Sequence, residues 1–322
     1  MGTGTEKKAK KRRPGPFMLI RLLGILLFIY ILTTVDLDIL WSQIRKVDSS
    51  YLFLGILFQV LLLFFKGIRW HLLNQGNLSR KGMNQSLGEF FESYAIGVIT
   101  PGRMGELVKA GHAREKNRIM ETGIRVGVER GFDMGIFVVL AGISLFFTFN
   151  DRAADTIGIL LMLAGFAVIV LAMIFLRSPG ATVIVGKLLN RIPFLKKDFM
   201  LSFQKRSNSV QLLVILLSLA SNFSYFISCY MLALGLSFEQ GFLFISGAVA
   251  IAGLLNMLPV TVMGLGTREG TFLLLFKPMA EPLILAFSGL VFLVAQIGGG
   301  LISLLLGQLF LALSQRNISR QK

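Results

Sequence analysis

The chain has 322 residues, of which 54% are hydrophobic, and its mean hydropathy is +0.71. Repeated apolar stretches of bilayer length identify an integral membrane protein, and no polar stretch is long enough to form a separate soluble domain. The net charge of +16 does not indicate nucleic acid as a partner, because the basic residues lie between the apolar stretches, as the positive-inside bias requires. A basic rim of this kind attracts anionic lipid headgroups, so membrane lipids are the expected partners.

In chain order, a basic segment over residues 1–16 precedes the first apolar stretch, Phe17–Thr34. We interpret this stretch as an uncleaved signal-anchor helix, because no small-residue cleavage site follows it. The segment Leu37–Val47 alternates apolar and charged positions at helical spacing, which predicts a helix lying along the membrane surface. Further spans are predicted at Ser50–Leu72, Ile119–Phe149, Thr156–Leu176, Val210–Leu236 and Pro282–Leu313. Together they form one transmembrane domain over residues 17–313, followed by a basic tail over 314–322.

The distribution of lysine and arginine predicts how the chain is threaded through the membrane. The N-terminus, the Leu72–Arg118 region, the Arg177–Arg206 connector and the tail are basic, whereas Asn150–Asp155 carries one arginine against two aspartates. The positive-inside rule therefore places both termini on the cytoplasmic side of the inner cell membrane. That topology requires the segment Gly241–Ala280 to enter and leave the membrane on the same side instead of crossing it.

Two segments inside the apolar sequence are interrupted by residues of the same kinds in the same order. Each contains proline and glycines, which break a helix, beside an arginine and a glutamate, which hydrocarbon rejects. These residues are Pro101, Gly102, Arg103, Gly105 and Glu106 in the first segment, and Asn256, Pro259, Gly264, Gly266, Arg268 and Glu269 in the second. Broken backbone at membrane depth is tolerated only where protein or a water-filled cavity surrounds it, and paired breaks in two halves indicate a transport site between structural repeats.

We interpret residues 83–111 and 241–280 as two re-entrant hairpins that dip into the membrane from opposite faces. The predicted fold is thus an all-α polytopic membrane protein with about six full spans and two broken-helix hairpins in an inverted-topology repeat. The alternative is that Met83–Lys109 merely lies on the inner surface of the membrane.

The two breaks have the chemistry of an anion site. The half-helix that starts after each break would present free backbone N–H groups, whose positive dipole end favours a phosphate. Arg103 and Arg268 lie beside these starts, and a guanidinium binds phosphate in a bidentate fork. Two roles remain open for Glu106 and Glu269: they hold the arginines in position, or they bind a coupling proton or cation.

More charged residues reach into the apolar run that follows the first segment. Glu129, Arg130 and Asp133 lie there, and ionisable groups at such positions face protein or a cavity. We predict that Arg130 pairs with Glu106. Arg130 and Lys109 are further candidate headgroup-binding cations, and Glu129 and Asp133 are further candidate carboxylates.

Other polar residues have simpler interpretations. Arg69 and Trp70, at the end of the second span, are predicted to anchor that span at the membrane interface. Glu89 and Glu92, one turn apart on a mostly apolar helix, either line a cavity or face the cytoplasmic surface. The single cysteine and the two histidines form no clustered ligand set, so we expect no metal ion and no cofactor.

On these residues the sequence resembles the flippase-like membrane region of the bacterial lysylphosphatidylglycerol synthases, the multiple peptide resistance factor family. The resemblance runs from Leu19 to Leu313. It is carried by the hairpin ending in Gly105-Glu106 with Lys109 downstream, by Glu129-Arg130 followed by Asp133, and by Asn256-x-Leu258-Pro259 followed by Gly264-x-Gly266 and Glu269.

The chain departs from the family pattern at three positions, without consequence for the fold. Thr100, Lys109 and Met263 stand where an apolar residue, an arginine and a glycine are common in the family. The resemblance implies a role in moving lipid. Because nothing after Leu313 could form the soluble aminoacyl-transfer domain of the full-length synthase, we do not expect lysine transfer.

The sequence thus predicts a transporter, or flippase, for a phosphate-containing lipid: a phospholipid, an aminoacyl-phospholipid or a polyprenyl-phosphate-linked lipid. No ATP-binding signature of the type G-x-x-x-x-G-K-[ST] occurs, so movement is expected to be downhill or coupled to an ion gradient. Two alternatives stay open, namely a membrane-embedded lipid-modifying enzyme and a non-catalytic partner subunit of such an enzyme.

Overall fold

The computed structural model describes residues 37–80, 82–111, 116–148, 151–177, 206–257, 263–277 and 279–319, and the elements in these ranges are helical. Five helical segments are long and apolar enough to cross a membrane: Ser49–Gln75, Glu121–Thr148, Arg152–Arg177, Asn208–Gly235 and Glu281–Gln315. They confirm five predicted spans to within a few residues. The predicted span Phe17–Thr34 lies outside the described residues, as does Pro259.

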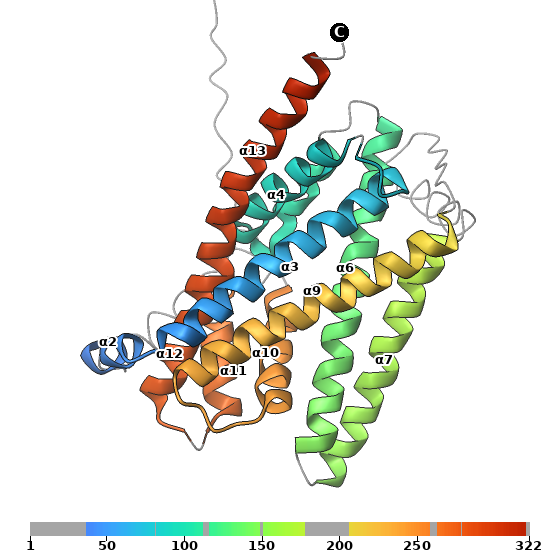
Figure 1. Cartoon of the computed structure of the whole chain (residues 1–322). Coiled ribbons are helices and arrows are strands. Elements are labelled where there is room, and N and C mark those ends of the chain that lie inside the picture. Colours follow the sequence, from blue (N-terminus) through green and yellow to red (C-terminus); the bar gives the residue numbers. More distant parts are fainter. Residues whose placement is uncertain are drawn as a thin grey trace, which may run out of the picture.

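Helices α3 (Ser49–Gln75) and α9 (Asn208–Gly235) cross the molecule together (Figure 1). Each begins at a side-chain cap, since the Asp48 carboxylate accepts a hydrogen bond from the Ser50 amide and the Ser207 hydroxyl accepts one from the Val210 amide. Ser228 of α9 donates to the Gly55 carbonyl of α3 at 2.7 Å. This pair supplies one wall of the interior.

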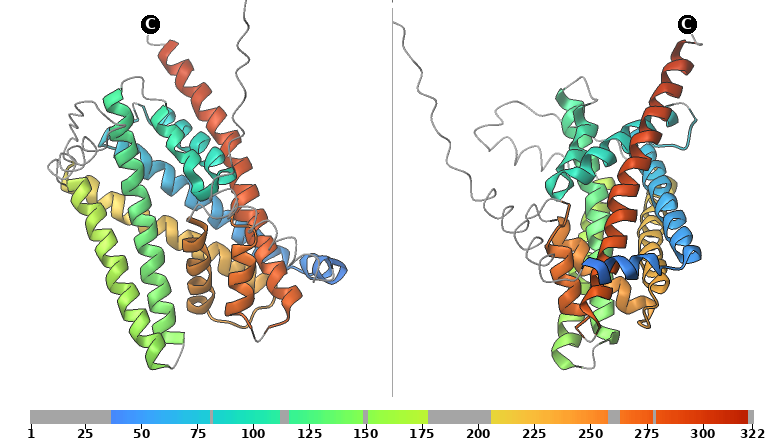
Figure 2. Two further views of the ribbon diagram at one scale, coloured as in Figure 1. Left: turned by 180° about the vertical axis from the view of Figure 1, so that it is seen from behind. Right: turned by 90° about the vertical axis from the view of Figure 1, so that its left-hand side faces the viewer.

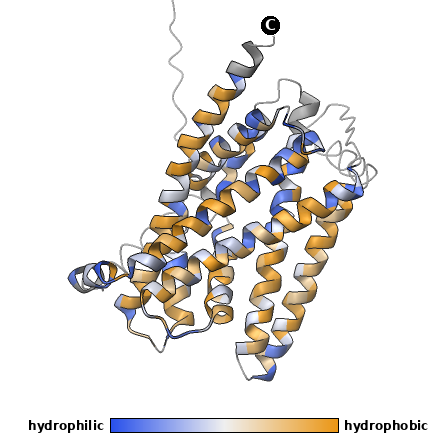
Figure 3. Cartoon of the chain, viewed as in Figure 1, coloured by the Kyte–Doolittle hydropathy of each residue, from blue (hydrophilic) through white to orange (hydrophobic). Residues whose placement is uncertain are grey.

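Helices α6 (Lys116–Thr148) and α7 (Arg152–Arg177) form a second antiparallel pair, in which glycines permit backbone contact. A Cβ atom added to Gly142 would lie 2.5 Å from the Gly158 carbonyl oxygen, and one added to Gly135 would lie 3.0 Å from that of Gly165. The buried residues of α7 are small apart from Leu176, and its other face is apolar and exposed (Figure 3). In a membrane that face contacts lipid.

The last span combines three elements in one continuous rod: α12 (Glu281–Val291), the π-helical segment η3 (Phe292–Gly298) and α13 (Gly299–Ser319). The short helix α2 (Leu37–Arg45) packs against α12 and projects to one side of the bundle (Figure 1). The predicted helix over this segment is confirmed, while its place on the membrane surface stays a prediction.

Both interrupted segments are broken helices. The first consists of α4 (Met83–Ile99), the 3₁₀ segment η1 (Pro101–Leu107) and α5 (Val108–Gly111). The second consists of α10 (Phe242–Met257), a turn over Met263–Gly266 and α11 (Thr267–Leu275).

The two broken helices lie toward opposite ends of the molecule (Figures 1 and 2). Helix α4 packs against α13, whereas α10 packs against α6. Because η1 contacts α10, the two breaks meet near the middle of the bundle. Behind the second break, the rings of Phe272, Phe276 and Phe287 lie within 6.0 Å of one another and join α11 to α12.

Candidate functional site

Local interactions turn the chain at the first break. Pro101 occupies the first position of η1, and the Thr100 hydroxyl accepts a hydrogen bond from the Gly105 amide at 2.7 Å while donating to the Gly97 carbonyl at 2.9 Å. A Cβ atom on Gly105 would lie 2.7 Å from the Ile96 carbonyl oxygen, so glycine lets η1 fold back onto α4. From the sequence, Thr100 is only a departure from the family pattern, yet its side chain closes the turn.

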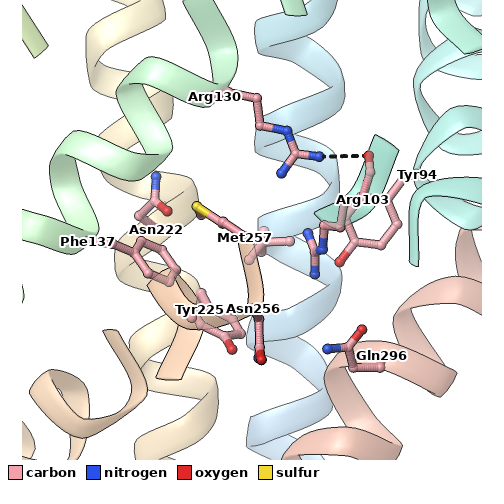
Figure 4. A pocket seen from close by; sticks show the side chains of 11 residues that line it. Tyr94, Arg103, Arg130, Phe137, Asn222, Tyr225, Asn256, Met257 and Gln296 are labelled. Atoms are coloured by element: carbon pink, nitrogen blue, oxygen red, sulfur yellow. Dashed lines mark hydrogen bonds between the residues drawn. The ribbon is translucent and has the colours of Figure 1, made fainter. Parts of the chain in front are cut away.

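The turn places Glu106 between two arginines. Arg130 Nη2 lies 2.8 Å from Glu106 Oε1, which confirms the predicted pair, and Arg103 Nη1 lies 4.0 Å from the same oxygen. Arg130 also donates to the Arg103 carbonyl at 3.3 Å (Figure 4). Arg103 has φ +53°, a left-handed backbone conformation that is costly for a residue with a side chain.

Lys109 lies deeper in the protein than Arg103. Its ammonium is 2.7 Å from Glu129 Oε2, and it sits 4.5 Å from the centroid of the Trp70 ring and 4.9 Å from that of Phe90. The Lys109 side chain is fully enclosed. Lys109 therefore neutralises Glu129, and its side chain does not line the cavity that lies between the two breaks.

Asp133 holds two cations from α3. Lys66 Nζ lies 2.7 Å from its carboxylate, and Arg69 binds both of its oxygens at 2.8 and 3.2 Å. Asn222 of α9 donates to Asp133 at 3.0 Å, and Arg69 Nε lies 3.5 Å from Glu129.

This network contradicts the prediction for Arg69 and Trp70. Both residues are 1% exposed and lie inside the protein, because the carboxylates of α6 and the ammonium of Lys109 give them buried partners. Three residues of this network were not predicted from sequence: Lys66, Asn222 and Ser218, whose hydroxyl accepts a hydrogen bond from Arg69 Nη1 at 3.0 Å. One signal was available, since Lys66 and Arg69 are two cations one turn apart in an apolar span, and such cations require partners.

We call the eight residues of these two groups of ion pairs the charged cluster: Lys66, Arg69, Lys109, Glu129 and Asp133 form one group, and Arg103, Glu106 and Arg130 form the other. Five of them are cations and three are carboxylates, so the cluster carries two positive charges in excess. A partly desolvated excess of charge is costly unless an opposite charge compensates it.

The second break is built differently. Gly264 has φ +75°, and a Cβ atom there would lie 2.4 Å from Asn256 Oδ1, which accepts a hydrogen bond from the Thr267 hydroxyl at 3.0 Å. Gly266 begins α11, and its amide donates to Glu269 Oε2 at 2.8 Å. Asn256 and the two glycines therefore fix the shape of the turn.

Arg268 and Glu269 neutralise each other. The Arg268 guanidinium binds Glu269 Oε1, and the Ser288 hydroxyl accepts from Arg268 Nε and donates to Glu269 Oε1, both at 2.8 Å. Arg268 is 3% exposed and its guanidinium carbon lies 5.1 Å from the Phe292 ring centroid. Ser288 was not predicted as a site residue.

A cavity of about 60 Å³ lies between the two breaks (Figure 4). It is large enough for a few water molecules. Its polar lining comes from both breaks and from the helices between them: Tyr94, Arg103, Arg130, Asn222, Tyr225, Asn256 and Gln296.

The four predicted headgroup-binding cations divide into two pairs. Arg103 and Arg130 line the cavity, with side chains that are 28% and 21% exposed. Lys109 and Arg268 are enclosed, with side chains that are 0% and 3% exposed, and they are occupied by their partner glutamates. Of the predicted hairpin residues, Asn256 also lines the cavity.

Comparison with known proteins identifies the family. The family model for the lysylphosphatidylglycerol synthase TM region matches residues 18–303. A search of curated proteins found no match to the chain. Given the apolar helices and the extent of the family match, the chain is a multi-pass membrane protein that belongs to the lysylphosphatidylglycerol synthase TM-region family.

Proposed function

We propose that this protein moves a phosphate-containing lipid across the inner cell membrane without ATP, and that Arg103 and Arg130 bind the phosphate. The observation that carries the proposal is the cavity between the breaks, which two partly exposed arginines of a net positive cluster line. A guanidinium pair suits a phosphate because it offers several directed N–H donors.

The charge balance supports an anionic headgroup. A phosphate ester brings roughly one to two negative charges at neutral pH, which matches the excess of the charged cluster. Glu106 forms an ion pair with Arg130 and lies near Arg103, so it orients both arginines toward the cavity. A phosphate would add a second acceptor to guanidinium groups that the carboxylate does not saturate.

The packing of the broken helices supports two re-entrant hairpins. A Cβ atom on Gly88 of α4 would meet Leu311 of α13 at 2.7 Å, and one on Gly253 of α10 would meet Phe137 of α6 at 2.3 Å. Each broken helix thus runs alongside the C-terminal half of a span. With both termini in the cytoplasm, these halves belong to opposite leaflets, as an inverted-topology repeat requires.

Transport would follow from a change in which side of the membrane reaches the cavity. The phosphate stays between the breaks while one repeat rocks against the other, and the lipid chains stay on the membrane-facing side of the protein. Arg268 and Glu269 keep the second break in shape during this movement, since their charges are already satisfied.

The test is translocation in reconstituted vesicles that contain fluorescent or isotopically labelled lipids. Arg103→Ala and Arg130→Ala should each slow the appearance of labelled headgroups on the far side about tenfold, because each removes a charge-assisted hydrogen bond. Arg152→Ala, on the exposed start of α7, is the matched control and should leave the rate unchanged.

The same vesicles separate the alternatives. Mass spectrometry of the lipids after incubation would detect a chemically altered product, and a new product would favour a lipid-modifying enzyme. Neither translocation nor chemical change would favour a partner subunit. Normal translocation by both arginine variants would contradict the phosphate site.

A further inference from the structure

An apolar groove of about 310 Å³ lies next to the cavity. Its lining includes Ile99 at the end of α4, Met263 at the second break, and three residues of the last span, Ile297, Gly300 and Leu301. Gln296 of η3 lines both the cavity and the groove. The two spaces therefore adjoin, with one polar side chain at the junction.

The groove opens sideways from the bundle. Ile99 is 62% exposed and Leu301 is 58% exposed, so hydrocarbon chains of the bilayer reach this surface directly. Its lining is apolar apart from Gln296. A polar cavity joined to an apolar, laterally open groove complements the polar headgroup and the hydrocarbon chain of an amphiphile.

Backbone irregularities shape this groove. The π-helical segment Phe292–Gly298 widens the last span at Gln296, and such segments often occur at functional sites. Met263 has φ +56°, a conformation that glycine adopts far more readily. A Cβ atom on Gly300 would have no neighbour closer than Val98 at 3.7 Å, so the groove has room at that position.

We propose that the groove between α4 and α13 binds a hydrocarbon chain of the same lipid whose phosphate occupies the cavity, and that this lipid enters laterally from the bilayer. The inference rests on the proposed function and specifies its substrate: an anionic phosphate joined to a hydrocarbon chain by a short polar linkage. Gln296, which donates weakly to the Met263 carbonyl at 3.4 Å, lies where that linkage would pass.

A second apolar groove provides an internal control. It has a volume of about 290 Å³ between α6 and α7 and is lined by Gly127, Gly131, Leu171 and Phe175 among others. It shares no lining residue with the cavity. A Cβ atom on Gly127 would have no neighbour within 4 Å, so a large side chain is tolerated there as well.

The experiment compares Gly300→Phe with Gly127→Phe, which fill the two grooves. In reconstituted vesicles, Gly300→Phe should slow translocation of a fluorescent phospholipid about tenfold. The phenylalanine ring would displace roughly two methylene groups of the lipid chain from the groove, and the loss of their burial corresponds to a factor of this size. Gly127→Phe should transport at the wild-type rate. Monodisperse elution of each variant in detergent establishes that it folds.

A second measurement does not depend on transport. A phospholipid with a photoreactive group in one acyl chain is activated in the same vesicles, and the labelled peptides are identified by mass spectrometry. We expect labelling of α4 and α13 beside the groove in the wild type, and its loss in Gly300→Phe but not in Gly127→Phe. Binding of glycerol 3-phosphate, which has no chain, should be equal in the wild type and Gly300→Phe.

The outcomes distinguish the two proposals. If the wild type does not translocate lipid but its helices α4 and α13 are labelled selectively, the groove assignment is correct and the proposed transport function is wrong. If the wild type translocates lipid and Gly300→Phe does so equally well, the groove assignment is wrong. Equal slowing by Gly127→Phe, or labelling spread evenly over α7 and α13, would likewise overturn it, because bulk lipid would then account for the occupancy.

Discussion

The two breaks share a motif of proline, glycine, arginine and glutamate but use it in different ways. At the first break, Glu106 forms an ion pair with Arg130 of helix α6, and the charged cluster carries an excess of positive charge. At the second break, Arg268 and Glu269 are neighbours in sequence and neutralise each other. Under the proposed function, the first break would therefore bind the ligand, while the second would give the cavity its shape.

The largest expected effect is a loss of stability when the Asp133 carboxylate, which binds Lys66 and Arg69, is removed. Asp133→Ala would leave Lys66 and Arg69 buried without their main acceptor, which should lower the free energy of unfolding by about 3–5 kcal/mol. Denaturant unfolding in detergent, or the yield of folded protein, measures this loss. Asp151→Asn, at an exposed position directly before α7, is the control and should change stability little. A stable Asp133→Ala variant would mean that the cluster is better solvated than its burial implies.

The second break should respond to Arg268→Ala mainly through stability. The substitution leaves Glu269 buried with the Gly266 amide and Ser288 but without its counter-ion, and we expect a loss of about 2–3 kcal/mol. Adding Glu269→Gln should recover part of that loss, which a double-mutant cycle measures. If Arg268→Ala instead stopped translocation while stability was unchanged, the two breaks would act alike.

A smaller loss of stability is expected when the close backbone contact between η1 and α4 at the first break is disturbed. Gly105→Ala would push a methyl group against the Ile96 carbonyl, and we expect a cost of about 1–3 kcal/mol in unfolding free energy. Gly123→Ala is the matched control, because nothing lies within 4 Å of its Cβ position. It should be neutral or stabilise by up to about 1 kcal/mol through helix propensity. Equal effects at the two positions would show that η1 does not need close contact with α4.

The smallest effect concerns strain at the second break. Met263→Gly should raise the free energy of unfolding by about 1 kcal/mol, since glycine adopts φ +56° without the cost that a side chain brings. Met134→Gly, at a partly exposed position in the interior of helix α6, should instead lower it by about 1 kcal/mol. Thermal unfolding of both variants in detergent gives the comparison, and a destabilised Met263→Gly would mean that the side-chain contacts of Met263 outweigh its backbone strain.

The sequence sufficed to predict features that depend on local composition. Five described spans agree with their apolar runs, because a helix of bilayer length must be apolar along its length. The breaks were identifiable because proline and glycine act on the backbone where they stand. The pairing of Arg130 with Glu106 followed from the need of each buried charge for a partner.

Features that depend on how helices cross could not be predicted in the same way. Asp133 meets Arg69 from α3 and Asn222 from α9, and these partners lie 64 and 89 residues away in the chain. Sequence alone does not define which side of α6 faces α3 and α9, so the burial of Arg69 was mistaken for an interfacial position. The role of Thr100 was missed for a local reason, since its hydroxyl replaces a backbone partner at the turn.

The glycine contacts between α6 and α7 bear on the mechanics of transport. Helix α6 carries Glu129, Arg130 and Asp133, and its backbone touches α7 at Gly135 and Gly142. Two helices in such close contact cannot slide apart in small steps without losing their packing. They would therefore move as one unit, so that Arg130 and the carboxylates of α6 would travel together with α7 when one repeat rocks against the other.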